Sequence, residues 1–227
     1  MPNHPQPAPQ GRAFSVEIPV DGERLQGTLA LPPAKVGVVA FAHGSGSSRH
    51  SPRNAFVARV LADAGICTLL FDLLTVTEDS DYATRFDIPL LSSRLVGATE
   101  WLARQDAVVG LPLGYFGAST GTAAALVAAA ELGPRVSAVV SRGGRPDMAG
   151  ASALGRVTAP TLLIVGGEDA TVIRLNREAY AQLVCPKALE IVPGATHLFE
   201  EPGTLDAAAA LAAKWFRRYL TPARSPG

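Results

Sequence analysis

Short apolar runs alternate with segments of helical length along most of this 227-residue chain. The runs are rich in Val, Ile, Leu and Phe and lie near residues 37–42, 67–71, 113–116, 136–140, 161–165 and 188–192. This alternation is typical of buried parallel strands joined by crossover helices. It predicts an α/β protein with a mostly parallel central sheet and helices on both faces.

The beginning of the sheet is expected to differ from the rest. The segments AFSVEIPV and RLQGTLAL flank Asp21-Gly22, a dipeptide that favours a two-residue hairpin turn. The sheet should therefore open with an N-terminal antiparallel hairpin and then continue in parallel.

Helix boundaries follow from capping residues and apolar spacing. Ser51 and Pro52 favour the start of one helix and Gly65 its end, and further helices are predicted over 119–132 and 205–220. An apolar stripe at helical spacing marks another helix, at Leu91, Leu95, Ala98 and Leu102. The longest polar connection, residues 74–87, is predicted to be a functional or mobile loop.

Length and composition favour a single catalytic domain over residues 13–220, because 48% hydrophobic residues suffice for one sizeable core. The polar segments 1–12 and 221–227 are expected to be a disordered N-terminal tail and a C-terminal tail.

The balance of charge argues against two classes of partner. Twenty Lys and Arg balance twenty Asp and Glu, so neither nucleic acid nor an anionic membrane is expected. With no apolar leader or membrane span, the prediction is a cytoplasmic protein. Cys67 and Cys185 are too few for a disulfide framework and lack the spacing of a metal site, so they are interpreted as reduced, buried thiols.

The strongest chemical signal is Gly117-Ala118-Ser119-Thr120-Gly121, which lies between a predicted strand and a helix-forming run. A sharp strand–turn–helix of the form G-x-S-x-G exposes a serine hydroxyl above the sheet and directs a helix N-terminus at it. Ser119 is therefore the candidate nucleophile.

An acid and a base follow Ser119 along the chain, each just after a strand. Asp169 follows the run TLLIV and His197 follows ALEIV, and catalytic groups of open α/β sheets gather at that edge. We predict His197 as general base and Asp169 as the acid that orients it. Glu168 and Asp147 remain alternatives for the acid.

A predicted oxyanion hole completes the set. One backbone N–H comes from Thr120, the residue after the nucleophile, and the other from the loop His43-Gly44-Ser45-Gly46 after an earlier strand. Ser45 is the preferred second donor, with Gly46 as the alternative. His43 is interpreted as a structural hydrogen-bonding residue in this loop.

The motifs HGSGSS, GASTG, GGED and GATH, in this order, resemble the α/β-hydrolase superfamily, and within it the small lidless esterases of the dienelactone hydrolase family. The likeness spans roughly residues 13–220. It implies the α/β-hydrolase fold, a catalytic triad, no cofactor, and hydrolysis of esters or lactones. Dienelactone hydrolases proper use a cysteine nucleophile where this chain has Ser119, so a dienelactone substrate is not carried over.

Lid domains of this superfamily usually follow the sixth strand, where only residues 141–159 are available here. We therefore expect no lid domain and an open site, with the 74–87 loop as its main movable wall. The prediction is a serine hydrolase acting on a small-molecule ester with a small acyl group. Peptidase or amidase activity, or a non-catalytic binding scaffold, remain alternatives, and the oligomeric state is left open.

Basic residues are expected near the mouth of this site. Arg142, Arg145, Arg49, His50 and Arg53 follow strands that end at the same edge. Arg142, His50 and Arg53 are therefore candidate substrate-binding residues, with Arg142 preferred, because arginine suits a carboxylate or phosphate. Acidic residues at this edge could instead pair with them, in which case the basic residues would only hold the structure.

Overall fold

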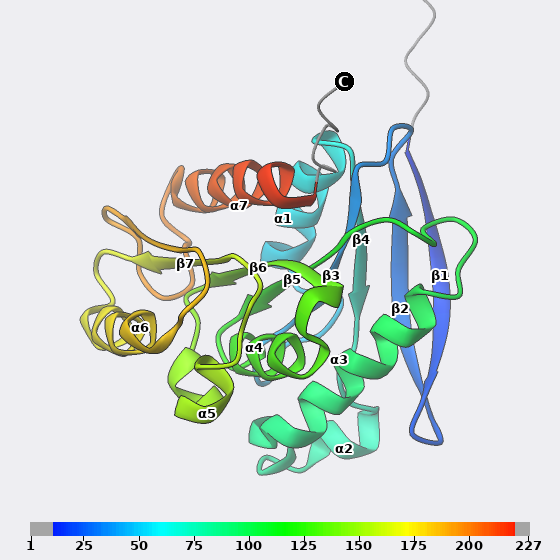
Figure 1. Ribbon diagram of the computed structural model, residues 1–227, viewed down its shortest axis with the longest axis horizontal. Helices are drawn as coiled ribbons and strands as arrows, with labels where there is room; N and C mark the ends of the chain where they lie inside the picture. The colour runs from blue at the N-terminus through cyan, green and yellow to red at the C-terminus, as the bar shows by residue number, and fades with distance from the viewer. Residues whose placement is uncertain (1–10, 221–227) are drawn as a thin grey trace, which may run out of the picture.

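The computed structural model describes residues 11–220, in which an eight-stranded sheet lies between two layers of helices (Figure 1). The strand order is β1-β2-β4-β3-β5-β6-β7-β8. The strands are β1 (Arg12–Val20), β2 (Glu23–Leu31), β3 (Gly37–Ala42), β4 (Ile66–Phe71), β5 (Leu113–Ala118), β6 (Val136–Arg142), β7 (Thr161–Gly166) and β8 (Lys187–Val192). The longer helices are α1 (Pro52–Asp63), α3 (Ile88–Leu102), α4 (Gly121–Leu132), α6 (Ala170–Gln182) and α7 (Thr204–Leu220).

The sheet opens with the predicted antiparallel hairpin. Asp21 and Gly22 both have positive φ, 50° and 81°, as a tight two-residue turn between twisted strands requires. β2 also pairs antiparallel with β4, with Gly27 opposite Phe71, and from β4 onward all neighbours are parallel. Within residues 11–220 the predicted fold class is confirmed: a mostly parallel α/β-hydrolase sheet with helices on both faces and no lid domain.

Each face of the sheet has its own hydrophobic core. On one face α1 and α7 cover a cluster that includes Phe41, Phe116 and Phe216, in which the first two rings lie 4.8 Å apart. On the other face α3, α4 and α6 cover a cluster that includes Tyr115 and Leu95 (Figure 1). Tyr115 and Phe116 are neighbours on β5 and point to opposite faces because side chains alternate along a strand.

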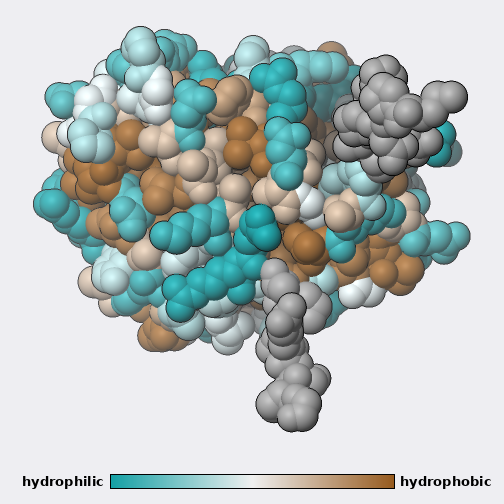
Figure 2. All heavy atoms as spheres, turned by 90° about the horizontal axis from the view of Figure 1, so that it is seen from above, coloured by the Kyte–Doolittle hydropathy of each residue, from teal (hydrophilic) through white to brown (hydrophobic). Residues whose placement is uncertain are grey.

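Helix α7 shows how one element serves both core and surface. Its inward side buries small and large apolar residues, among them Ala212 and Phe216. Lys214, Arg217 and Arg218 are exposed, and Figure 2 shows a face on which hydrophilic and hydrophobic residues are interspersed. Within residues 11–220, no helix combines the length and the apolar character that crossing a membrane would need.

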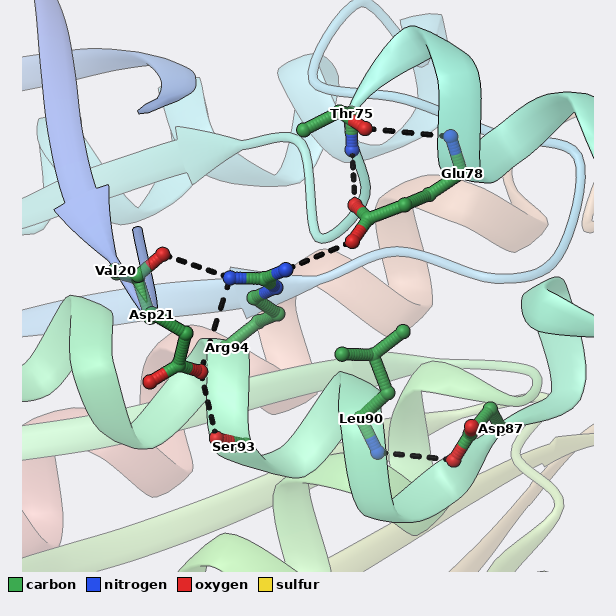
Figure 3. A network of polar contacts seen from close by, with 8 residues as sticks. All are labelled: Val20, Asp21, Thr75, Glu78, Asp87, Leu90, Ser93 and Arg94. Carbon is green, nitrogen blue, oxygen red and sulfur yellow. Dashed lines mark hydrogen bonds and ion pairs between the residues drawn. The ribbon is translucent and has the colours of Figure 1, made fainter. Parts of the chain in front are cut away.

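Residues 74–87 are more ordered than the predicted loop, because they form two short helices, α2 (Val76–Ser80) and η1 (Thr84–Phe86). A capping box fixes α2: Thr75 Oγ1 accepts from the Glu78 N–H, and Glu78 accepts from the Thr75 N–H. Buried Arg94 of α3 donates to Glu78 at 2.7 Å and to the Val20 carbonyl at 2.7 Å (Figure 3). The segment is therefore tied to the first hairpin through one guanidinium.

Other boundaries differ slightly from the predictions. α4 begins at Gly121, two residues after the predicted start, because Ser119 and Thr120 form the turn that precedes it. α7 begins at Thr204. The connection after β6 holds two short helical segments, η3 (Pro146–Ala149) and α5 (Gly150–Leu154), and η2 (Gly133–Arg135) precedes β6. Strand β1 begins at Arg12, inside the predicted N-terminal tail. Residues 1–10 and the predicted tail 221–227 lie outside the described residues.

Candidate active site

Ser119 lies in a strained turn between β5 and α4. Its φ is 49°, a left-handed conformation that is uncommon for a residue with a side chain. Such conformations cost about 1–3 kcal/mol and persist only where the surrounding structure imposes them. Here the Ser119 N–H donates to the Arg142 carbonyl at 3.3 Å, and the Ser119 carbonyl accepts from the Arg145 N–H at 3.0 Å. The turn is thus held against the end of β6.

The two motif glycines are required by close approach of the backbone. A Cβ on Gly117 would lie 2.5 Å from Thr122 Cα, and one on Gly121 would lie 2.1 Å from the Ala42 carbonyl oxygen. Both distances are well below van der Waals contact, so only glycine allows the helix to leave the strand this sharply. Figure 1 shows α4 leaving the sheet directly after β5.

The predicted acid and base are in contact. His197 Nδ1 lies 2.7 Å from Asp169 Oδ2. Asp169 comes directly after the short turn that follows β7, and it is the N-cap of α6. Its Oδ1 accepts from the Val172 N–H at 3.2 Å. The carboxylate is therefore held by two partners, and with Nδ1 occupied, the Nε2 atom of His197 remains for another group.

The two alternative acids lie elsewhere. Asp147 receives hydrogen bonds from Arg145 at 2.7 to 3.2 Å. Glu168 is exposed. Of the three carboxylates considered from the sequence, only Asp169 contacts His197 within residues 11–220.

The loop after β3 passes close to the nucleophile. A Cβ on Gly44 would lie 3.0 Å from Ser119 Cβ, so the backbone of this loop lies against the serine. The Ser45 N–H donates to the side-chain Oγ1 of Thr120 at 2.8 Å, so a hydrogen bond joins the two residues whose backbone N–H groups are the predicted oxyanion donors. Gly46 faces Arg85, whose side chain binds Asp79, so the 74–87 segment flanks this loop.

His43 has the predicted structural role in the loop. The residue is 7% exposed, its Nδ1 lies 3.0 Å from the Gly44 carbonyl oxygen, and its Nε2 accepts from the Leu73 N–H at 3.0 Å. This arrangement requires a neutral ring that carries its proton on Nδ1. Burial lowers the pKa of His43, which favours that neutral form.

A cavity of about 260 Å³ opens beside Ser119. His197, Arg142, Arg53 and Asn54 line it together with the serine and the oxyanion loop. The predicted binding residue His50 is exposed and is not among the residues that line this cavity.

A larger cavity, about 530 Å³, lies between α3, α4 and the η3–α5 segment. Val96, Val127 and Met148 line it, but none of the predicted catalytic residues does. We therefore place the candidate site at the smaller cavity, where nucleophile, base and strained backbone coincide. Within the described residues, no three side chains of His, Cys, Asp or Glu gather as a metal site would need.

Comparison with known proteins identifies the family. The crystal structure of dienelactone hydrolase from Anabaena variabilis is 57% identical in sequence, covers 93% of this chain and 99% of its own, and superposes with a TM-score of 0.90. The chain belongs to the dienelactone hydrolase family. The present chain also shares its fold with the esterase domain of a Rhodothermus marinus protein. The two are 21% identical and superpose with a TM-score of 0.74, over 92% of this chain and 99% of that one.

A curated relative from Mycobacterium tuberculosis carries a different description. It is provisionally described as a phosphoribosyl transferase and is 57% identical over 212 residues, which are 93% of this chain. The chain spans about half of that protein, 48% of its length. No family model matches the chain.

Proposed function

We propose that this protein is a serine hydrolase that cleaves small carboxylic esters or lactones through Ser119, His197 and Asp169. The observation that carries the proposal is the left-handed Ser119 at the β5–α4 turn, in one cavity with a histidine that is hydrogen-bonded to a carboxylate. A strained nucleophile with base and acid in place serves acyl transfer, whereas a binding surface has no need of the three together.

The reaction proceeds in two acyl transfers. Ser119 Oγ attacks the carbonyl carbon while His197 Nε2 takes the hydroxyl proton, and the tetrahedral intermediate then expels the alcohol, which receives that proton. Water attacks the resulting acyl-enzyme with His197 again as base, and the carboxylic acid leaves as Ser119 regains its proton. Asp169 stays ionised throughout and stabilises the imidazolium that forms twice per turnover.

The negative charge of each intermediate is stabilised by backbone N–H groups of Thr120 and Ser45 and by the N-terminus of α4. In the free enzyme the Ser45 N–H donates to the Thr120 hydroxyl. The oxyanion takes over this donor, and the hydroxyl rotates to donate to the oxyanion or to a neighbouring acceptor.

The size of the cavity favours compact substrates. At about 260 Å³ it lies below the range of about 300–1,000 Å³ that is usual for drug-sized ligands. Its walls include hydroxyl, amide and guanidinium groups, which suit a short polar acyl chain better than a lipid.

The description of the Mycobacterium tuberculosis relative suggests phosphoribosyl transfer as a second candidate activity. The Mycobacterium tuberculosis relative is about twice as long as the matched region. We propose that its description refers to the half that this chain does not match. A transfer assay of this chain with an activated phosphoribosyl donor should give no product, and product formation would overturn this assignment.

A panel of matched ester and amide substrates tests the proposed function. The parent enzyme should cleave short p-nitrophenyl esters, and Ser119→Ala should lower kcat by several orders of magnitude. Faster turnover of matched anilides would instead indicate an amidase. Equal, low activity in the parent and in Ser119→Ala towards both kinds of substrate would favour the non-catalytic scaffold.

A further inference from the structure

The buried face of α6 carries one polar side chain, Asn176, between Val172 and Ala179. The residue is 0% exposed. Its Nδ2 donates to the Gly144 carbonyl at 2.9 Å and to the Val172 carbonyl at 2.8 Å, while its Oδ1 has no partner among the described residues. A buried amide with an unpaired oxygen stabilises a core less than an apolar side chain of the same shape would. The presence of Asn176 therefore needs a reason other than stability.

Only one of the two hydrogen bonds of Asn176 joins separate parts of the chain. The bond to Val172 stays within α6, where helix geometry already provides that carbonyl with a backbone donor. The bond to Gly144 reaches the segment 143–145, which directly follows β6. No other donor among residues 11–220 reaches the buried Gly144 carbonyl.

The segment 143–145 contacts both the nucleophile and the base. Gly143 has a φ of 54°, and a Cβ on it would lie 3.0 Å from the His197 carbonyl oxygen and 3.7 Å from His197 Cε1. At the other end, the Arg145 N–H donates to the Ser119 carbonyl at 3.0 Å. The residue between these two contacts is Gly144, whose carbonyl accepts from Asn176.

The opposite side of this segment is packed without free space. A Cβ on Gly144 would lie 2.0 Å from Ser141 Oγ and 2.3 Å from Thr122 Oγ1, and these two hydroxyl oxygens lie 3.0 Å apart. The segment is therefore held between β6 and the first turn of α4 on one side and Asn176 on the other. Without the amide, the Gly144 carbonyl would be buried and unpaired, and the segment would shift until the carbonyl found another donor.

Helix α6 also holds the third member of the site, because Asp169 is its N-cap. We propose that Asn176 is a positioning residue, which acts through the Gly144 carbonyl to keep Ser119 and His197 in register with Asp169. This inference rests on the proposed function, since it assigns a role in the geometry of the same three residues. Misplacement of reacting groups by about 1 Å can cost about 100-fold in rate, so one hydrogen bond to this segment has a measurable effect on turnover.

Asn176→Leu tests the proposal because leucine has a similar shape and no donor. At a temperature well below its Tm, the variant should lose about 10- to 100-fold in kcat for a short p-nitrophenyl ester. The KM should change by less than about threefold, because neither Asn176 nor Gly144 lines the cavity beside Ser119. The rate at which a fluorophosphonate labels Ser119 should fall by a factor similar to that of kcat.

Asn176→Ser is the second variant. Serine can still donate to the Val172 carbonyl within the helix, but it is too short to reach Gly144. It should show the same kinetic losses, and it decides the question if Asn176→Leu does not fold.

Ala179→Gly is the matched control for loss of stability. Ala179 is buried on the same face of α6, and glycine there lowers helix stability while Asn176 remains. The Tm should fall by about 2–4 °C, with kcat and the labelling rate unchanged. If the Asn176 variants likewise show a lower Tm with the kcat and labelling rate of the parent, or a raised KM alone, the proposal is overturned.

The labelling experiment also separates this inference from the proposed function. A parent enzyme in which Ser119 is not labelled and no ester is cleaved would overturn both. A parent that cleaves esters and is labelled at Ser119, together with Asn176 variants labelled equally fast, would overturn the positioning role alone.

Discussion

The substitution Asp169→Asn separates catalysis from stability at one side chain. In the parent, Asp169 Oδ2 faces His197 Nδ1 at 2.7 Å, and Oδ1 caps α6 by accepting from the Val172 N–H. Asparagine keeps an oxygen for the cap but presents an amide NH₂ to the imidazole. His197 must then accept at Nδ1 and carry its proton on Nε2, where it cannot take the proton of Ser119.

The expected effects differ greatly in size. Turnover of a short p-nitrophenyl ester should fall by about 10⁴, or about 5 kcal/mol in activation free energy. The free energy of unfolding should change by less than about 1 kcal/mol, because the capping oxygen remains. Asp169→Ala should show the same catalytic loss and an additional loss of about 1 kcal/mol in stability, because it also removes the cap.

Asp147→Asn is the matched control for this experiment. It breaks the partly exposed pair with Arg145 and leaves His197 untouched, so kcat should change only a few-fold. Steady-state kinetics and thermal unfolding of the three variants decide the matter. A kcat near that of the parent in Asp169→Asn, or a greater loss in Asp147→Asn, would require a different acid.

Three further outcomes follow from the structure. Glu78→Ala should lower the free energy of unfolding, measured by chemical denaturation, by about 2 kcal/mol because buried Arg94 loses its closest carboxylate. Arg24→Ala, which removes an exposed ion pair with Glu17, should leave it nearly unchanged. Burial lowers the pKa of His43, so its contribution to stability is complete above about pH 6.5 and falls as the pH decreases; His43→Gln should show a shallower fall between about pH 6.5 and 5. Esters of two- to four-carbon acids should be cleaved faster than long-chain esters, and the reverse order in kcat/KM would refute the argument from cavity size.

Local signals in the sequence were sufficient for much of the fold. Asp21-Gly22 predicted the hairpin because the turn needs two residues with positive φ. The sharp turn at Ser119 was predictable because it needs glycine at positions 117 and 121, where neighbouring backbone leaves no room for a Cβ atom. The pairing of β2 with β4 was not predicted, since it joins segments about 40 residues apart through tertiary packing.

Two further features of the structure could not be predicted from the sequence, each for its own physical reason. Helix α2 is five residues long, too short for an apolar period, and the only local signal was its capping box from Thr75 to Glu78. The sequence placed several arginines and carboxylates at one edge, but which of them pair depends on side-chain directions that spacing does not fix. Arg49 and Arg145 have carboxylate partners within 4.0 Å, whereas Arg142 has none among residues 11–220.

Covalent labelling of the nucleophile tests the central claim most directly. The intact parent is incubated with a fluorophosphonate, digested, and mapped by mass spectrometry, with Ser119→Ala and Ser45→Ala in parallel. We predict a single adduct on Ser119, formed equally well in Ser45→Ala, absent in Ser119→Ala, and strongly slowed in His197→Ala. An adduct on another serine with Ser119 unmodified, or a labelling rate that does not depend on His197, would contradict the account.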